Sequence, residues 1–424
     1  MFVRIDNAPR PYAWGSTSAI SMLLGSTPSG GPEAELWLGA HPGSPAVLTE
    51  PSAFGGARTL SEWIAAAPSD ALGGHPRLPF LLKILAAASP LSLQAHPSAE
   101  QARDGYQREN ALGIPLDAAT RNYKDPYPKP ELIYALSERF DALCGFRPVA
   151  ETRAMLAELG LDDLAARLES LPATVEWLVT RGEGVDALVA QVVALAAGVA
   201  PLAGGAVALA AGVAPLAVGA VSKTKEIGGE TARSDAETAK TGQNSLVFDE
   251  PLDTVRMLAA EYPDDPGIVI SLLLNRVTLK RGEALYLPAG NIHAYLGGLG
   301  VELMTSSDNV LRGGLTPKHI DAAELLRVLD FTPTAVPYLV PEAGEGAASI
   351  FRPDGPGFAL VQIEGAAEYE LTGPAIAICT AGEFIIAGGA ASVVLGRGES
   401  VYITPDERAL VFTGDGELFL ATTA

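Results

Sequence analysis

The chain has 424 residues, 48% of them hydrophobic, and is therefore long enough to bury two or three cores of ordinary domain size. Its formal charge of −21 argues against nucleic acid as a partner, because a phosphate backbone is bound mainly through lysine and arginine. Two widely separated cysteines, Cys144 and Cys379, allow neither a disulfide framework nor a cysteine-rich zinc site. The first residues lack the apolar segment of a signal peptide, so we expect a cytoplasmic protein.

The first 150 residues are predicted to form short β-strands. Apolar stretches at 78–85, 90–96 and 131–136 are separated by glycine and proline, which is typical of strands joined by turns. In the second stretch Gln94 and His96 stand two residues apart, and side chains with that spacing point to one face of a strand. One strand can therefore offer an amide oxygen and an imidazole nitrogen to the same ion.

The segment 151–250 has the apolar spacing of helices, so we expect an all-α insertion within a β-domain. It contains a tandem repeat, in which residues 193–206 recur at 207–220 with one difference. Residues 187–222 carry no charge, which raises the question of a membrane span. Pro201 and Pro215 would interrupt such a helix, and short buried helices are favoured instead.

Strand-like sequence resumes at 271, within a predicted second part of the β-domain at 251–325. Here the stretch from Leu287 to Asp321 gathers His293, Glu302 and Arg312 among glycines and turns. Asp308 and Asn309 are expected to form a turn that positions Arg312 through hydrogen bonds from side chain to backbone.

The last part of the chain, 326–424, repeats a rhythm of strand, glycine turn and strand. It contains no histidine. We expect a second, C-terminal β-barrel.

A metal site can be assembled from these segments. Gln94, His96, Glu131 and His293 make a mixed nitrogen and oxygen set, which suits zinc or another borderline divalent metal. The pair Gln94 and His96 alone is weak evidence, because an isolated histidine in a strand is more often structural.

The chain resembles the type I phosphomannose isomerases, of the cupin superfamily, in several blocks that run in the family's order. These blocks are YAWGS at 12–16, AELWLGAHP at 34–42, LSLQAHPSAEQA at 91–102, YPKPELIYALSERFDALCGFRP at 127–148 and YLPAGNIHAYLGGLGVELMTSSDNVLRGGLTPKHID at 286–321. The chain departs from the family at Tyr127 and Pro128, where the family often has Asn-His before Lys-Pro-Glu. The segment 151–250 and the last hundred residues match no block.

The resemblance implies a fold, a reaction and a set of site residues. The implied fold is mainly β, with a cupin-type jelly-roll catalytic barrel at 1–150 and 251–325, a helical insertion at 151–250 and a C-terminal jelly-roll domain at 326–424. The implied metal is one zinc ion per chain, held by Gln94, His96, Glu131 and His293. The implied catalytic arginine is Arg312, and the matching pocket positions are Ser92, Lys129, Tyr295, Glu302 and Lys318.

The implied reaction interconverts mannose 6-phosphate and fructose 6-phosphate by proton transfer through an enediolate. For the base we favour Glu302, with a lysine of lowered pKa or a metal-held hydroxide as alternatives. Because the net charge repels a dianionic sugar phosphate, a local cluster of Lys129, Arg312 and Lys318 must attract it at short range. We expect a phosphorylated hexose as the partner, neither nucleic acid nor membrane, and a monomer or weak homo-oligomer.

Two other functions are compatible with the same set of site residues. Two histidines and a carboxylate also bind Fe(II) in non-heme oxygenases, but Gln94 would fill a position that oxygen chemistry needs. A non-catalytic sugar-binding barrel is the other alternative, since a fold does not define a function.

Overall fold

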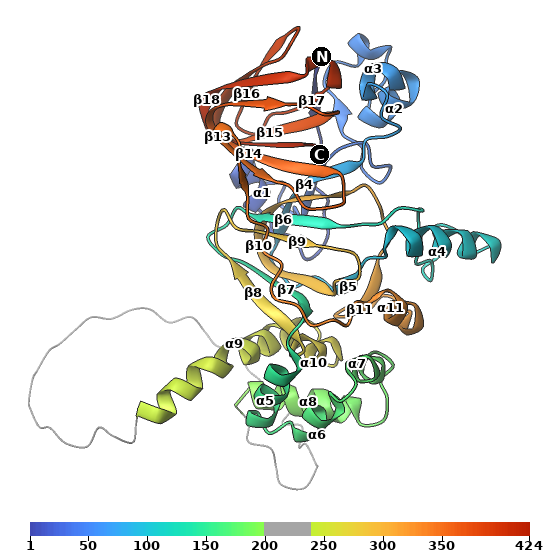
Figure 1. Cartoon of the computed structure of the whole chain (residues 1–424), viewed down its shortest axis with the longest axis vertical. Helices are drawn as coiled ribbons and strands as arrows, with labels where there is room; N and C mark the ends of the chain where they lie inside the picture. The colour runs from blue at the N-terminus through green and yellow to red at the C-terminus, as the bar shows by residue number, and fades with distance from the viewer. Residues whose placement is uncertain (199–238) are drawn as a thin grey trace, which may run out of the picture.

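The chain folds into two antiparallel β-sheets with a group of helices at one end, which confirms the prediction of a mainly β protein (Figure 1). The structure is a computed structural model that describes residues 1–198 and 239–424, with the backbone alone for 239–249. One sheet lies in the middle of the molecule and is called the central sheet. The other contains the strands nearest the C-terminus and is called the C-terminal sheet.

The central sheet has nine strands, and five of them follow the order β11-β5-β10-β4-β2. Strands β6 and β7 also pair with β10, while β9 pairs with β6 and β8 pairs with β7. They are β2 (Glu35–Leu38), β4 (Phe80–Ala87), β5 (Leu93–Ala95), β6 (Glu131–Ala135), β7 (Phe140–Phe146), β8 (Leu274–Leu279), β9 (Ala284–Leu287), β10 (His293–Thr305) and β11 (Leu311–Gly314). Strand β10 pairs with β5 and β7 near its start and with β4 and β6 toward its end. It therefore joins both halves of the sheet.

The C-terminal sheet also has nine strands, ordered β12-β13-β14-β18-β15-β17-β1-β3, with β16 beside β15. They are β1 (Phe2–Asp6), β3 (Val47–Leu48), β12 (Glu342–Ala343), β13 (Glu345–Phe351), β14 (Phe358–Glu370), β15 (Ala375–Ala387), β16 (Ser392–Gly396), β17 (Ser400–Ile403) and β18 (Ala409–Thr423).

Helices occupy the sheet connections and one end of the molecule. They are α1 (Ala19–Leu24), α2 (Leu60–Ala66), α3 (Pro68–Leu72), α4 (Ala99–Ala111), α5 (Val149–Glu158), α6 (Asp162–Arg167), α7 (Leu171–Val179), α8 (Val185–Ala196), α9 (Ala239–Glu261), α10 (Gly267–Ser271) and α11 (Ala322–Val328), with 3₁₀ turns η1 (Pro51–Phe54) and η2 (Pro405–Glu407). Helices α5 to α10 all fall between β7 and β8, so the helical segment runs past 250 to Ser271.

Strand β4 shows how the sheets share their core. All eight of its residues are buried, and alternate side chains point to opposite faces. Leu82 and Ile84 pack in a core that includes Phe351 and Phe419 of the C-terminal sheet. Leu85 packs on the opposite face. By the same alternation, the side chain of Lys83 points to the face on which Leu85 packs. We call this face the interior of the central sheet.

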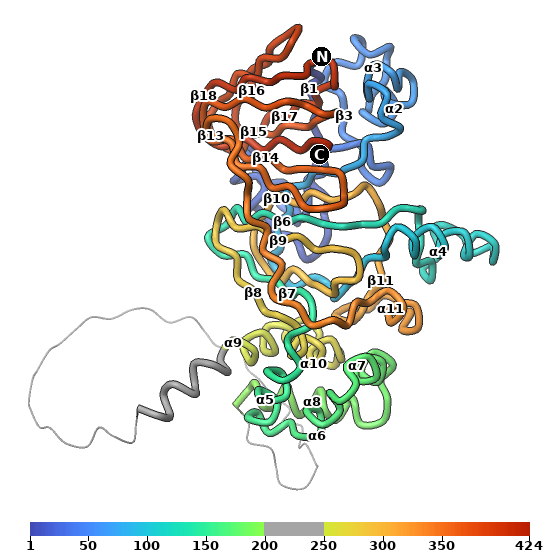
Figure 2. The backbone as a smooth tube through the Cα atoms, in the orientation of Figure 1, coloured from blue at the N-terminus to red at the C-terminus, as the bar shows by residue number. Residues whose placement is uncertain are grey.

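The first strand does not belong to the sheet where it was expected. Val3 in β1 pairs with Tyr402 in β17, and Ile5 pairs with Leu48 in β3 (Figure 2). The start of the predicted catalytic barrel at 1–150 is therefore part of the C-terminal sheet. Alternation along β1 predicts which side chains are buried, but it does not say which distant strand supplies the hydrogen bonds.

Helices α5 to α10 cover the outer face of the central sheet. Leu93 and Ala95 of β5 pack in the same core as Leu178 of α7 and Ile268 of α10. Among the described residues, no helix combines the length and the apolar composition that crossing a membrane requires. The stretch 199–222, with Pro201, Pro215 and the whole second copy of the repeat, lies outside the described residues.

Candidate metal centre

Two imidazoles and one carboxylate meet inside the central sheet. The Nε2 atom of His96 lies 3.2 Å from Oε1 of Glu131, and Nε2 of His293 lies 3.2 Å from Oε2 of the same carboxylate. All three side chains are 1% exposed, and their ligand atoms lie within 4.8 Å of one another. Ligands of a tetrahedral zinc ion are separated by about 3.3 Å, given bonds of about 2.0–2.1 Å. Each imidazole nitrogen is thus already near that spacing from one oxygen of the carboxylate.

Both imidazoles are turned so that Nε2 faces the carboxylate. Nδ1 of His96 lies 2.7 Å from the carbonyl oxygen of Asn309, and Nδ1 of His293 lies 3.0 Å from that of Asn291. A carbonyl can only accept, so each Nδ1 carries a proton, and in the neutral imidazole Nε2 then presents a lone pair. Among the residues that the structure describes, Nε2 of His96 and Oε2 of Glu131 find no hydrogen-bond partner. Buried polar atoms are rarely left unpaired, and a cation between them would satisfy both.

The charge state of the cluster also suits a metal. Burial lowers the pKa of His96 to about 4, with the Lys129 cation adding to the effect, so the imidazole is neutral at pH 7. Burial opposes ionisation of Glu131, but Lys129 and His96 hold its pKa well below the usual range. Nζ of Lys129 lies 2.7 Å from Oε1 of Glu131. The set therefore includes a neutral imidazole at His96 and an anionic carboxylate at Glu131.

Strand register brings Gln94 and Arg312 beside this cluster. Gln94 on β5 is paired with His293 on β10 and with Arg312 on β11, so the three form a row across neighbouring strands. Nε2 of the Gln94 amide lies 3.4 Å from Nε2 of His293. Rotating the amide by half a turn places its oxygen there instead, as a ligand to a metal would require.

The predicted basic cluster divides in two. Lys129 is paired with Glu131, whereas Arg312 and Lys318 stand six positions apart, and the Arg312 cation lowers the pKa of Lys318. Nη1 of Arg312 donates a 2.9 Å hydrogen bond to Oγ of Ser92. Neither Arg312 nor Lys318 has an ion-pair partner within 4.0 Å among the side chains that the structure describes. The two cations are available to an anionic ligand.

An interior ion pair includes a residue that the sequence did not single out. Lys83 on β4 is paired across the sheet with Glu302 on β10, and its Nζ lies 2.7 Å from Oε2 of that glutamate. Nζ also lies 3.4 Å from Oε1 of Glu35 and 5.1 Å from the ring of Trp37. The sequence feature that could have revealed this ion pair is the lysine inside the apolar run LPFLLKIL, since lysine is almost never fully buried without a partner.

The pair is close enough to Glu131 to be affected by it. Burial raises the pKa of Glu302, against the effect of the Lys83 cation and with a contribution from Glu131. Burial alone would lower the pKa of Lys83, but Glu302 and Glu35 raise it above its ordinary value. Lys83 is therefore a cation and not a lysine of lowered pKa. The buried hydroxyl of Tyr295 stands near both Glu302 and Glu131, and its pKa is well above 10.0 because of burial.

The turn residues before Arg312 do a different job from the predicted one. The Asn309 side chain accepts from the backbone N–H of Lys124 at 2.7 Å and donates to the carbonyls of Asp125 and Tyr127 at 2.8 Å each. Asp308 is paired with His41 at 3.3 Å. The Asn309 side chain therefore fixes the loop at 124–127, next to Lys129, and Asp308 contacts His41. Sequence spacing could not reveal this, since the partners are about 185 positions away.

Replacing Asn309 by alanine is expected to lower the free energy of unfolding by about 2–4 kcal/mol, because three backbone groups of the loop lose their partner in a buried site. Urea unfolding should show a lower midpoint with an unchanged slope. Gln107→Ala, at an exposed position of α4, is the control and should change stability by less than about 0.5 kcal/mol. Equal midpoints for the two variants would contradict the role given to Asn309.

Comparison with known proteins gives one consistent result. The model of the phosphomannose isomerase type I catalytic domain matches residues 2–149. The mannose-6-phosphate isomerases of Salmonella typhimurium and Escherichia coli are 35% and 34% identical to the chain, each over 98% of both sequences. The human mannose-6-phosphate isomerase is 31% identical over 84% of this chain and 80% of its own length.

Solved structures agree with the sequence relatives. A crystal structure of mannose 6-phosphate isomerase bound with zinc and yttrium has a TM-score of 0.79 and 32% identity, covering 100% of this chain and 99% of that one. A zinc-bound holo form has a TM-score of 0.80 at the same identity and coverage. Identity above 30% over nearly the whole length, together with the same fold, shows that the chain belongs to the type I phosphomannose isomerase family.

Proposed function

We propose that the chain is a zinc-dependent isomerase that interconverts mannose 6-phosphate and fructose 6-phosphate. The observation that carries this proposal is the buried cluster of His96, Glu131 and His293 with Gln94 and Arg312 in the adjoining strand row. The relatives that match nearly the whole chain are named for that activity. The oxygenase alternative is not favoured, because the relatives and solved structures reported above are isomerases and Gln94 supplies a fourth ligand position.

Zinc fits the residues that would hold it. His96 and His293 supply nitrogen, Glu131 and Gln94 supply oxygen, and Nε2 of His96 and Oε2 of Glu131 are buried without a described hydrogen-bond partner. When bound there, zinc would act as a Lewis acid that polarises a substrate oxygen. Lys129 would keep Glu131 ionised, and the carbonyls of Asn309 and Asn291 would keep both imidazoles in the ligand tautomer.

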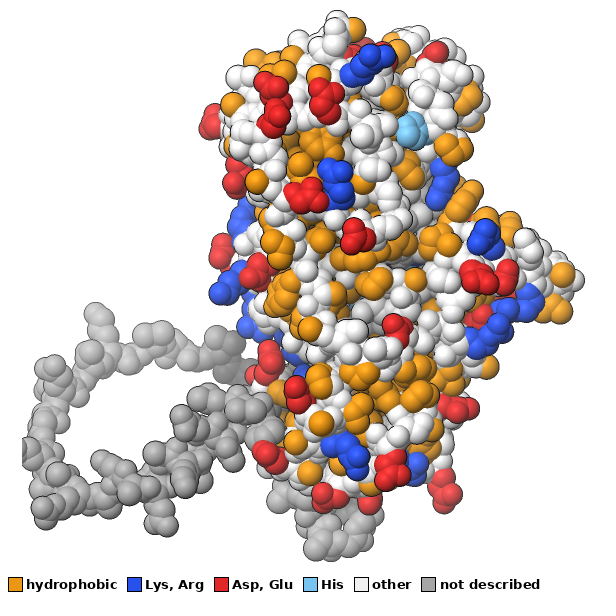
Figure 3. Space-filling view, in the orientation of Figure 1, with side chains coloured by type: hydrophobic (Ala, Val, Ile, Leu, Met, Phe, Trp, Pro, Cys, Tyr) orange, Lys and Arg blue, Asp and Glu red, His pale blue; other side chains and the backbone are white. Residues whose placement is uncertain are grey.

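Arg312 and Lys318 would bind the phosphate. On the face seen in Figure 3, acidic side chains are spread over the C-terminal sheet, the central sheet and the helices. This surface repels a dianion at long range, whereas the two cations, which have no described acidic partner, attract it within a Debye length of about 8 Å. Ser92, which accepts from Arg312, would fix the guanidinium in place.

Proton transfer would fall to the interior pair. The isomerisation moves a proton between C2 and C1, and Glu302 is a buried carboxylate whose pKa is raised by burial, which favours its work as a general base. Lys83, held as a cation, would stabilise negative charge that develops on the sugar oxygens. Tyr295 would line the same interior between Glu302 and Glu131.

We further infer the domain layout from the sheets. The central sheet corresponds to a cupin-type catalytic barrel within 1–150 and 251–325, the C-terminal sheet to a second jelly roll at 326–424 completed by β1 and β3, and the helices between β7 and β8 to an inserted domain. A cytoplasmic location and a monomer or weak homo-oligomer are part of the same proposal.

One assay tests the function. Purified protein is given mannose 6-phosphate, and fructose 6-phosphate is followed by a coupled reaction before and after chelation. We expect turnover in the zinc-loaded protein, a loss of more than about a hundredfold after chelation and recovery on adding zinc. Metal analysis of the same sample should find zinc near one equivalent. Absence of turnover in zinc-loaded protein would rule out the isomerase, and iron bound in place of zinc in a protein without turnover would favour the oxygenase.

A further inference from the structure

The two phosphate-binding candidates, Arg312 and Lys318, are joined by a short loop whose backbone is held in unusual conformations. Leu315 has φ of 55°, in the left-handed region that residues with side chains rarely adopt. It is also fully buried. Its side chain packs in the core formed by the helices that cover the outer face of the central sheet. Burial against those helices therefore offsets the strain and fixes the middle of the loop.

A carboxylate from the helical segment holds the same loop by its backbone. Asp265, in the turn between α9 and α10, accepts from the N–H of Gly267 at 2.7 Å through Oδ1 and from the N–H of Thr316 at 3.3 Å through Oδ2. Oγ1 of Thr316 in turn accepts from the N–H of Lys318 at 3.1 Å. A chain of hydrogen bonds thus runs from the helical segment to Lys318.

Close contact between the two turns makes this connection specific. Gly314 has φ of 137°, and a Cβ there would lie 2.9 Å from Oδ1 of Asp265 and from the Cα of Gly267. A Cβ at Gly267 would meet Leu315 at 2.9 Å. Neither position has room for a side chain. The loop therefore passes directly against the helical turn that carries Asp265.

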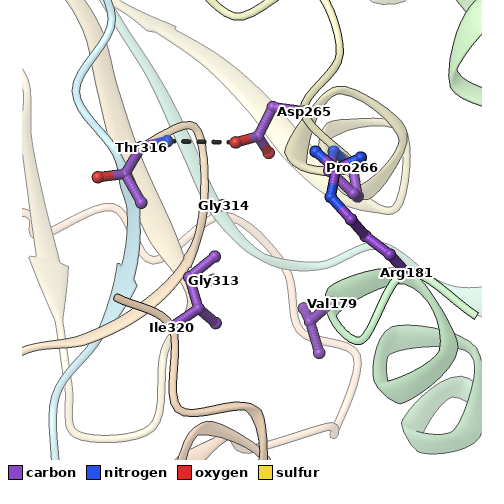
Figure 4. Close-up of a pocket in the computed structure, with 8 residues that line it drawn as sticks. All are labelled: Val179, Arg181, Asp265, Pro266, Gly313, Gly314, Thr316 and Ile320. Carbon is purple, nitrogen blue, oxygen red and sulfur yellow. Dashed lines mark hydrogen bonds between the residues drawn. The ribbon is translucent and has the colours of Figure 1, made fainter. Parts of the chain in front are cut away.

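On the other side of Gly313 and Gly314 the loop is not packed. A cavity of about 110 Å³ lies there, lined by Val179, Arg181, Asp265, Pro266, Gly313, Gly314, Thr316 and Ile320 (Figure 4). Arg181 closes its helical side, donating to the carbonyl of Asp264 at 2.8 Å and to Asp186 at 2.7 Å. Because the loop borders this cavity on one side, the hydrogen bonds from Asp265 contribute more to holding it in place.

We propose that Asp265 and Thr316 are positioning residues that set the placement of Lys318 relative to Arg312 for a phosphate ligand. The helical segment between β7 and β8 would then contribute to substrate binding without touching the sugar. This inference rests on the proposed function only in taking the anionic ligand to be the phosphate of the substrate. It concerns binding of the phosphate and not the metal or proton transfer.

The test compares Asp265→Asn with Asp264→Asn, a neighbouring exposed acid whose side chain makes no described contact. Asparagine keeps one acceptor oxygen and cannot serve both N–H groups. We expect KM for mannose 6-phosphate to rise about tenfold in Asp265→Asn with kcat within about twofold, and the dissociation constant of inorganic phosphate, measured by calorimetry, to rise equally. Zinc content should stay near one.

The sign of the effect separates positioning from charge. Removing an anion near the loop would by Coulomb attraction alone tighten the binding of a dianion, so a higher KM cannot come from the lost charge. A second pair of variants tests the same role in case Asp265→Asn misfolds. Thr316→Val should weaken phosphate binding, whereas Thr316→Ser, which keeps the hydroxyl, should bind phosphate as the wild type does.

The outcomes are distinguishable from failure of the proposed function. If the wild-type chain binds inorganic phosphate but does not isomerise mannose 6-phosphate, the isomerase proposal fails, and calorimetry still tests the positioning. If phosphate binds equally to Asp265→Asn and Asp264→Asn, or equally to both Thr316 variants, the positioning role is overturned.

Discussion

Replacing Glu131 by glutamine is expected to remove zinc and activity together. The carboxylate faces His96 and His293 at 3.2 Å each and is the only anion of the ligand set. A neutral amide cannot offset the charge of a divalent ion, and Lys129 at 2.7 Å would add repulsion. We expect bound zinc to fall from near one equivalent to below about a tenth, and kcat/KM to fall by about a thousandfold or more.

Metal analysis and the coupled isomerase assay on the same dialysed samples measure both effects. Glu138→Gln, seven positions further on and exposed, is the matched control and should keep full zinc and activity. A Glu131→Gln protein that held zinc and turned over normally would show that the metal binds elsewhere.

Glu302→Gln should leave the metal in place and slow the reaction. Glu302 lies opposite Lys83 and makes none of the contacts of the His96, Glu131 and His293 cluster. Loss of a general base costs about a hundredfold to ten-thousandfold, so kcat should fall by at least a hundredfold while zinc stays near one equivalent. Glu345→Gln, exposed on β13, is the control and should match the wild type. Normal turnover in Glu302→Gln would exclude it as the base.

The pH profile gives an independent check. A base acts in its ionised form, so kcat/KM falls as pH drops through the pKa of Glu302. Because burial raises that pKa, the acid limb should lie above the ordinary value of 4.5, and it should vanish in Glu302→Gln.

Lys83→Met should also lower kcat, and the double variant of Lys83→Met with Glu302→Gln should be little worse than the poorer single variant, because the two side chains act as a pair. Additive losses would show that they act separately.

The sequence predicted those parts of the site that depend on spacing within one strand. Ser92, Gln94 and His96 lie at i, i+2 and i+4, and Leu93 and Ala95 between them pack on the opposite side. Alternation would place Leu91 on that opposite side too, but it joins the interior cluster around Tyr295. Alternation depends only on backbone geometry, which is why it can be predicted without knowing the partners of the strand.

Features that depend on pairing between distant segments could not be predicted in this way. The row of His293, Gln94 and Arg312 requires β5 to lie between β10 and β11, and a shift of one residue would reverse every side chain. The resemblance to a family supplied these residues, but not their order across the sheet. Lys83 was missed because an apolar run predicts burial without saying what a charged residue inside it meets.

The course of β10 has a consequence for how the chain acquires its metal. Gln94 and His293 are paired although 199 positions separate them, and the helices α5 to α10 lie between them in the chain. Contacts of such long range form late in folding, since loop closure must precede them. An unfolded chain therefore presents isolated histidines in place of a ligand set. Zinc that binds only the folded chain would stabilise it in proportion to the logarithm of the free metal concentration.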